Sequence, residues 1–309
     1  MRRREVGSRV FKLDEDRLKN HKMRSLVWIA LLVIQVAVAH AQSGSVYVCP
    51  MHADVQSDKP GNCSRCGMTL IESRGDDFRE FPIAVETMPK PAVAGADMRL
   101  RLSVFDPTSG QLVRDFERVH EKLLHLFIVS EDLSYLDHLH PQLDSDGRFS
   151  LLVRLPKEGH YQVIADFVPR GGIPQMVQRP LLTQGHRAGL ASAHLVDTGV
   201  RQFTSDGVTL ELESAPRIVG AASEITVRAT GRTLEPYLGT IAHLLLVSED
   251  LSEVVHAHSD LDGNRLRFDV HFPRPGRYRL WVQVQASGKV ITAPFVITAD
   301  RPETPFLSR

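Results

Sequence analysis

All cysteines of the chain lie between residues 46 and 70. There are three, Cys49, Cys63 and Cys66, and the last two have the spacing C-x2-C. Cys49 and His52 repeat this spacing with one cysteine exchanged for histidine. Two such knuckles bring together three thiolates and one imidazole, the donors of a tetrahedral Cys3His site. The segment therefore predicts a metal site formed by Cys49, His52, Cys63 and Cys66.

The donor types leave the identity of the metal open between copper and zinc. Met51 and Met68 lie beside ligand positions and can add thioether sulfur. Soft sulfur donors favour Cu(I), whereas a closed Cys3His shell favours zinc. The alternative to a metal is a disulfide, which would leave one thiol over in an exported chain. A segment this short buries little apolar surface, so a bound metal would also supply its folding free energy.

A second group of candidate ligands occurs twice with the pattern H-x12-H-x-H. Residues two apart in a strand share a face, so the last two histidines of each copy are neighbours. A symmetric hairpin would place the first histidine directly opposite the second. Each copy is thus a secondary candidate for a copper or zinc site, and the alternative is that these histidines only pack on a strand surface. The residues are His125, His138 and His140, then His243, His256 and His258.

The histidine patterns belong to an internal repeat in which residues 123–141 match residues 241–259. Alternating apolar and polar residues at 98–102 and 208–212 predict half-buried strands, and no long helical periodicity occurs outside the N-terminus. We therefore predict an all-β chain with two tandem immunoglobulin-like β-sandwiches. Tyr161 and Tyr278 each follow a glycine by two residues and are candidates for tyrosine corners.

The N-terminus has the features of an export signal. Residues 26–39 are uncharged and apolar, too few for an ordinary membrane-spanning helix. Ala39, His40 and Ala41 then form an A-x-A cleavage site. We predict a signal peptide over residues 1–41, with Met23 as an alternative start, and an uncleaved membrane anchor as the alternative. In both cases the mature chain would lie in the periplasm or be secreted.

The remaining organisation follows from composition. We predict a knuckle domain at 42–71, a charged linker at 72–80, and sandwiches at 81–198 and 199–309. Lys+Arg and Asp+Glu number 37 each, so the formal net charge is zero. That balance gives no electrostatic footprint for nucleic acid, and membrane contact is expected only through an uncleaved N-terminus.

The cysteine segment resembles the small heavy-metal-binding domain found beside bacterial copper- and silver-exporting ATPases and in some periplasmic efflux adaptors. That family has the pattern Y-x-C-P-M-H-P, a spacer with P-G, then C-P-x-C-G-M-x-L. The chain departs from it at Ala53 and Ser64, neither of which is a ligand position. The repeats resemble, more loosely, uncharacterised secreted bacterial proteins with D-L-S…H-x-H-P and G-x-Y motifs. This second resemblance implies a sandwich fold and a metal context but no activity.

Together these features predict an exported protein that binds a heavy metal, copper above all, for resistance or delivery. The alternative is a structural zinc module whose sandwiches dock an efflux or envelope partner. A metalloenzyme built on a histidine triad is less favoured, because the chain has no G-x-S-x-G, no H-E-x-x-H and no carboxylate placed as an obvious base beside the histidines. We predict no catalytic residues.

Overall fold

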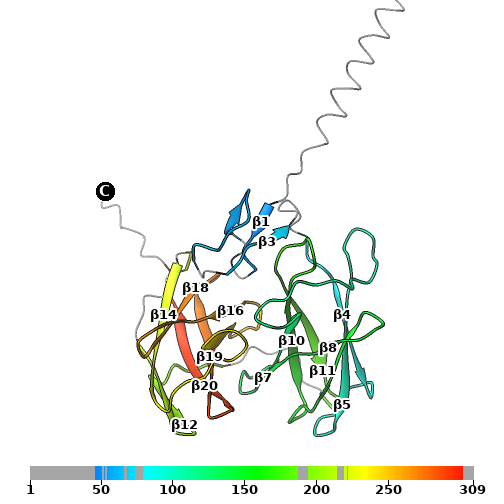
Figure 1. Cartoon of the computed structure of the whole chain (residues 1–309). Helices are drawn as coiled ribbons and strands as arrows, with labels where there is room; N and C mark the ends of the chain where they lie inside the picture. The colour runs from blue at the N-terminus through cyan, green and yellow to red at the C-terminus, as the bar shows by residue number, and fades with distance from the viewer. Residues whose placement is uncertain are drawn as a thin grey trace, which may run out of the picture. The chain divides into compact units, whose positions relative to one another are not determined.

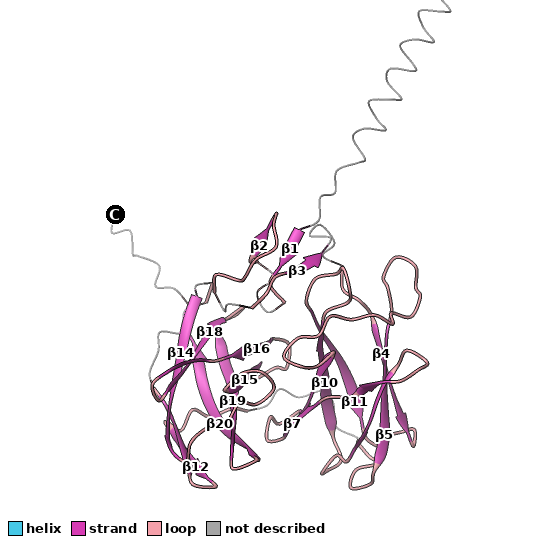
Figure 2. Ribbon diagram, viewed as in Figure 1, coloured by secondary structure: helices cyan, strands magenta, loops and turns pink. Residues whose placement is uncertain are grey.

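The computed structural model describes residues 46–50, 52, 54–65, 68–73, 79–186, 194–213, 219–220 and 222–301. The predicted signal peptide at 1–41, Met51 and Cys66 lie outside these residues. Within the described ranges the chain consists of strands, turns and loops (Figure 2), as expected for an all-β protein. No helix in them is long and apolar enough to cross a membrane.

The knuckle domain is a three-stranded antiparallel sheet with the order β2-β1-β3. Its strands are β1 (Val46–Val48), β2 (Gln56–Ser57) and β3 (Ile71–Ser73). Among the described residues of this domain, one buried hydrophobic cluster forms, and its buried members are Cys49, Cys63 and Leu70. Two of these three are candidate metal ligands, so the domain has very little apolar core besides its own site.

The first sandwich consists of two four-stranded sheets. One has the order β4-β5-β9-β8, with β4 (Ile83–Met88), β5 (Met98–Val104), β8 (Gln142–Leu143) and β9 (Phe149–Val153). The other has the order β11-β10-β6-β7, with β6 (Leu124–Ser130), β7 (Leu136–Leu139), β10 (His160–Phe167) and β11 (Gln175–Leu182). These strands are coloured cyan to green in Figure 1.

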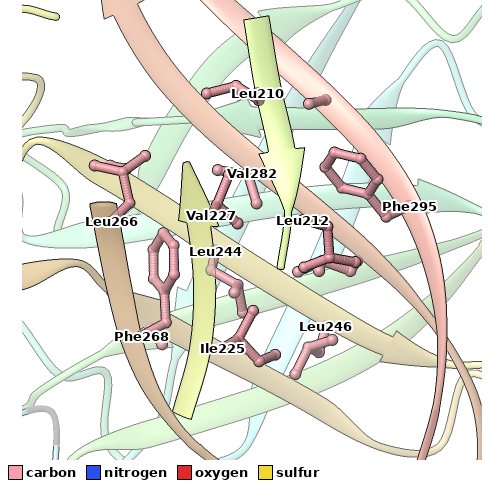
Figure 3. Close-up of a cluster of buried hydrophobic side chains, with 14 of the residues drawn as sticks. Leu210, Leu212, Ile225, Val227, Leu244, Leu246, Leu266, Phe268, Val282 and Phe295 are labelled. Atoms are coloured by element: carbon pink, nitrogen blue, oxygen red, sulfur yellow. The ribbon is translucent and has the colours of Figure 1, made fainter. Parts of the chain in front are cut away.

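The second sandwich repeats this plan with a five-stranded and a four-stranded sheet. The first sheet, β12-β13-β14-β18-β17, contains β12 (Gln202–Ser205), β13 (Val208–Leu212), β14 (Ala222–Gly231), β17 (Asp260–Asp262) and β18 (Arg265–His271). The second, β16-β15-β19-β20, contains β15 (Ala242–Ser248), β16 (Val254–His258), β19 (Gly276–Ala286) and β20 (Lys289–Ala299). Side chains of both sheets meet in one core, where Val227 and Phe268 lie near Leu244 (Figure 3).

Both sandwiches have the tyrosine corner that the sequence predicts. The hydroxyl of Tyr161 donates a hydrogen bond to the Lys157 carbonyl oxygen over 2.8 Å. The hydroxyl of Tyr278 donates in the same way to the Arg274 carbonyl oxygen over 2.7 Å. Both rings are fully buried. These tyrosines therefore have a structural role in each repeat.

Strands β6 and β15 are buried along their whole length, because each packs on two cores. In β6, Leu126 and Ile128 belong to the core of the first sandwich, whereas Phe127 and Val129 belong to a separate cluster. That cluster contains residues of both sandwiches, so it is the surface along which they pack. We call it the interdomain core; its buried members are Phe127, Val129, Leu133, Ile164, Leu195, Leu245, Val247, Leu251 and Trp281.

The predicted hairpin register is wrong by two residues in both repeats. His138 lies opposite Phe127 instead of opposite His125. His243 lies opposite His258 instead of opposite His256. The loop is longer than expected, since Ser130 bonds to Tyr135 and a left-handed residue, Leu133 (φ 53°), lies between them. A shift of two keeps every side chain on its face, so the histidines still share one.

Candidate metal centres

The knuckle site brings together the three predicted ligands that the structure describes. Both Cys49 Sγ and Cys63 Sγ lie 3.7 Å from His52 Nδ1. A tetrahedral ion with a metal–sulfur bond of about 2.3 Å and a metal–nitrogen bond of about 2.0–2.1 Å would separate these atoms by about 3.6 Å. The backbone N–H of Arg65 donates to Cys63 Sγ over 3.4 Å. The donor set and its spacing fit a bound metal ion.

No disulfide joins Cys49 and Cys63, the two cysteines among the described residues. The fourth predicted ligand, Cys66, and the candidate thioether Met51 lie outside those residues. The other candidate thioether, Met68, lines a cavity next to His52. The structure therefore brings together three of the four predicted ligands. The contributions of Cys66 and Met51 stay predictions.

Each histidine triad converges on one point. In the first, His125 Nδ1 lies 3.2 Å from His138 Nε2 and 3.3 Å from His140 Nε2. In the second, His243 Nδ1 lies 3.4 Å from His256 Nε2. One nitrogen from each member of a triad lies within 4.8 Å of the others. Three nitrogens bound at about 2.0–2.1 Å to a tetrahedral ion would be about 3.3 Å apart, so both triads have the spacing of metal ligands.

The triads lie on the strands that form the interdomain core, on the face that points to the opposite sandwich. The ring centroids of His125 and His256 are 5.5 Å apart, and those of His138 and His243 are 5.4 Å apart. Phe127 of the interdomain core stacks on His138 at 4.3 Å. The sequence predicts two separate triads, whereas the structure places them in contact.

Two polar residues that the sequence did not indicate complete this arrangement. Asp166 Oδ2 lies 2.7 Å from His256 Nδ1, and Gln283 Oε1 lies 2.8 Å from His138 Nδ1. The sequence has no carboxylate placed as an obvious base beside the histidines, but the fold brings Asp166 next to one of them. Asp166 bonds the ring nitrogen that faces away from the triad, so it orients His256. An acidic residue within the apolar end of strand β10, between Ala165 and Phe167, was the signal for it.

Burial keeps the triad histidines in the neutral form that binds metals. Burial, followed by the neighbouring His256, lowers the pKa of His125 to about 4. Burial also lowers the pKa of His256 to about 3, and raises the pKa of Asp166 to about 6. At neutral pH the contact between them is therefore an ionised carboxylate that accepts a hydrogen bond from the Nδ1–H of a neutral imidazole. This is the state in which a carboxylate strengthens a metal-binding histidine.

The knuckle site and the second triad open onto the same cavity, which has a volume of about 1030 Å³. His52 and Met68 line it from the knuckle domain, and His120, His256 and His258 line it from the sandwiches. The ring centroid of His120 lies 3.7 Å from that of His258. Candidate ligands of both kinds therefore border one cavity.

Comparison with known sequences assigns the segments that carry these sites. The heavy metal binding domain family matches residues 46–73. A domain of unknown function, DUF8832, matches residues 82–178 and again residues 203–301, more than half of the chain together. The chain is a member of the DUF8832 family. Each of its two DUF8832 copies carries one histidine triad.

One curated relative shares a short segment with this DUF8832 protein. A copper-transporting P-type ATPase of Rhizobium leguminosarum bv. viciae is 57% identical over 30 residues, which is 10% of this chain and 4% of that protein. The chain thus spans a small fraction of the relative that it matches.

The solved structures similar to the chain include a bacterial adhesin and a tandem fibronectin type-III segment. The Escherichia coli adhesin FdeC is 14% identical, with 75% of this chain and 68% of that chain covered and a TM-score of 0.24. A two-domain fibronectin type-III segment of chicken tenascin is also 14% identical, with 71% and 98% covered and a TM-score of 0.22. These scores lie well below 0.5, so the sandwich assignment rests on the chain's own sheets.

Proposed function

We propose that the protein is an exported metal-binding protein that captures copper through its knuckle domain, for metal resistance or for delivery to a partner in the envelope. The convergence of Cys49, His52 and Cys63 within a heavy-metal-binding domain is the observation that carries this proposal. Cys66 supplies the fourth ligand. The sandwiches act as a scaffold and a docking surface.

Several features favour copper over zinc as the captured ion. Two thiolates and an adjacent thioether, Met68, are soft donors, and soft donors select Cu(I). The one curated relative described above is a copper transporter. His52 and Met68 both line a cavity, so the ion sits where a donor or acceptor protein can reach it.

The test is the metal content of the protein produced with its own leader and purified from the periplasm. We expect copper in the wild-type chain and the loss of one copper ion per chain in the double variant Cys49→Ser and Cys63→Ser. Ser64→Ala is the matched control, because Ser64 lies in the same loop, is exposed and is no ligand. This control should retain the full copper content.

Other outcomes would separate the alternatives. Zinc that remains bound in the presence of excess Cu(I) under reducing conditions would replace copper capture by a structural zinc role. Copper content that is equal in the wild type and in the cysteine variant would contradict the proposal outright. Recovery of the protein only in the membrane fraction would replace export by an uncleaved anchor.

A further inference from the structure

Hydrogen bonds outside the triads indicate which ring nitrogen carries the proton in two histidines of each triad. His125 Nε2 lies 3.1 Å from the carbonyl oxygen of Val119, which can only accept, so Nδ1 of neutral His125 has a lone pair. In the structure Gln283 presents Oε1 to His138 Nδ1 and donates from Nε2 to Thr292 Oγ1, so His138 Nδ1 is the donor in this contact. Nε2 of His138 therefore also has a lone pair. The two lone pairs face each other at 3.2 Å and repel unless a cation lies between them.

The second triad repeats this geometry. His243 Nε2 lies 3.0 Å from the Tyr237 carbonyl oxygen, and His256 Nδ1 lies 2.7 Å from the Asp166 carboxylate. Their remaining nitrogens, both with lone pairs, are 3.4 Å apart. Among the described residues, neither buried ring nitrogen of His258 has a hydrogen-bond partner. One metal ion bound by all three rings would satisfy these nitrogens.

Each triad is oriented by the opposite sandwich. Asp166 pairs with His125 across β10 and β6, and Gln283 pairs with His243 across β19 and β15, so they occupy equivalent positions of the repeat. Each reaches across the interdomain core to a histidine of the other repeat. Neither sandwich can therefore build its site alone.

We propose that the two triads form one two-ion metal centre between the repeats, distinct from the knuckle site, in which the triad of the second repeat binds its ion first. The order follows from the one difference between the orienting residues. A carboxylate behind a ligating histidine makes it a better donor and offsets the charge of the ion, which the neutral amide of Gln283 does not. The second ion also meets the positive charge of the first.

The donors of this centre select other ions than the knuckle does. Neutral imidazole nitrogens without sulfur suit Cu(II) and Zn(II). Three protein ligands leave a fourth position open at each ion, for water or another ligand. The centre extends the proposed function, because it gives the protein a second metal site. Its nitrogen donors are harder than the thiolates of the knuckle.

The test is a titration of the full mature chain with Cu(II), in a background with Cys49→Ser, Cys63→Ser and Cys66→Ser that removes the knuckle ligands. We expect two ions per chain in two steps, with nitrogen coupling in the electron paramagnetic resonance spectrum. His256→Ala should remove the tighter step, and His138→Ala the weaker one. His271→Ala, a change at an exposed histidine on β18, should leave both steps unchanged.

Two near-isosteric variants test the order of binding without opening a cavity. Asp166→Asn should weaken the tighter step by about 10–100-fold, the usual effect of losing such an orienting residue. Gln283→Glu should tighten the weaker step. Asp97→Asn, at an exposed carboxylate, is the matched control.

Binding of no ion by the cysteine-free chain would overturn the proposal. So would a single ion that is lost equally on His138→Ala and on His256→Ala, with thermal unfolding showing both variants folded. Equal affinities before and after Asp166→Asn would overturn the binding order. Because the knuckle ligands are absent from this background, none of these results bears on copper capture by the knuckle.

Discussion

The knuckle domain and the interdomain histidine centre place similar donors in opposite structural settings. The knuckle has a buried cluster of Cys49, Cys63 and Leu70, two of which are ligands, so removal of an ion would remove most of what holds it together. His125 and His243 instead lie on strands β6 and β15, which are buried on both faces between two complete cores. We therefore expect the fold of the knuckle to depend on its metal, and the histidine centre to be formed by the sandwiches without one.

This difference has a consequence for exchange. A site that forms with its ion is flexible without it, which suits capture and release. A preorganised site needs little free energy of reorganisation when the metal binds, because its ligands are already at the right spacing. In the triads the N···N distances are 3.2–3.4 Å. The two settings thus suit different tasks with the same class of ligand.

Removal of metal should have the largest effect, and only on the knuckle. Chelation should collapse the amide resonances of residues 46–73 to random-coil shifts, because metal binding supplies about 10–16 kcal/mol in comparable zinc domains. The dispersed resonances of the sandwiches should persist. Heteronuclear NMR of the chain with and without chelator measures both. If the knuckle resonances stayed dispersed after full metal removal, the knuckle fold would not depend on metal, and the two regions would not differ in this respect.

Loosening the interdomain core should have the next largest effect, and in the opposite place. Trp281 is almost fully buried there, so Trp281→Ala should cost about 3–5 kcal/mol of unfolding free energy. It should also weaken metal binding by the triads while leaving the knuckle affinity unchanged. Denaturant unfolding and metal titration check this, with Leu152→Ala at a 69% exposed position as control. If the metal affinity of the knuckle fell as much as that of the triads, the two sites would be coupled.

The sequence predicts much of the fold for physical reasons that can be named. Strict alternation predicts β5 and β13, and the glycine two residues before Tyr161 and Tyr278 predicts the corners. The Cys and His spacing predicts the knuckle ligands because such chelation is local. The hairpin register fails because a left-handed Leu133 lengthens the loop, and residue type does not reveal that conformation.

The contact between the triads could not be predicted from spacing, since it depends on how the two sandwiches dock. One signal was present. Residues 124–130 and 242–248 lack the alternation of a half-buried strand, and every residue in them is buried. A strand that is apolar on both faces needs a second surface to pack against. When two such strands occupy equivalent positions of a repeat, the simplest prediction is that they pack against each other. Asp166 and Gln283 contact the histidines of the opposite repeat only because the two sandwiches dock in this way.

The smallest expected effect concerns the tyrosine corners, which fasten each sandwich without any metal. Tyr161→Phe and Tyr278→Phe each remove one buried hydroxyl that donates to a carbonyl oxygen, which should cost about 1 kcal/mol. The cost should be the same with metal present and after chelation, because the fold of the sandwiches does not depend on the ion. Denaturant unfolding of each variant under both conditions measures it. A cost that appears only in the metal-loaded chain would mean that the sandwiches, like the knuckle, take part of their stability from the metal.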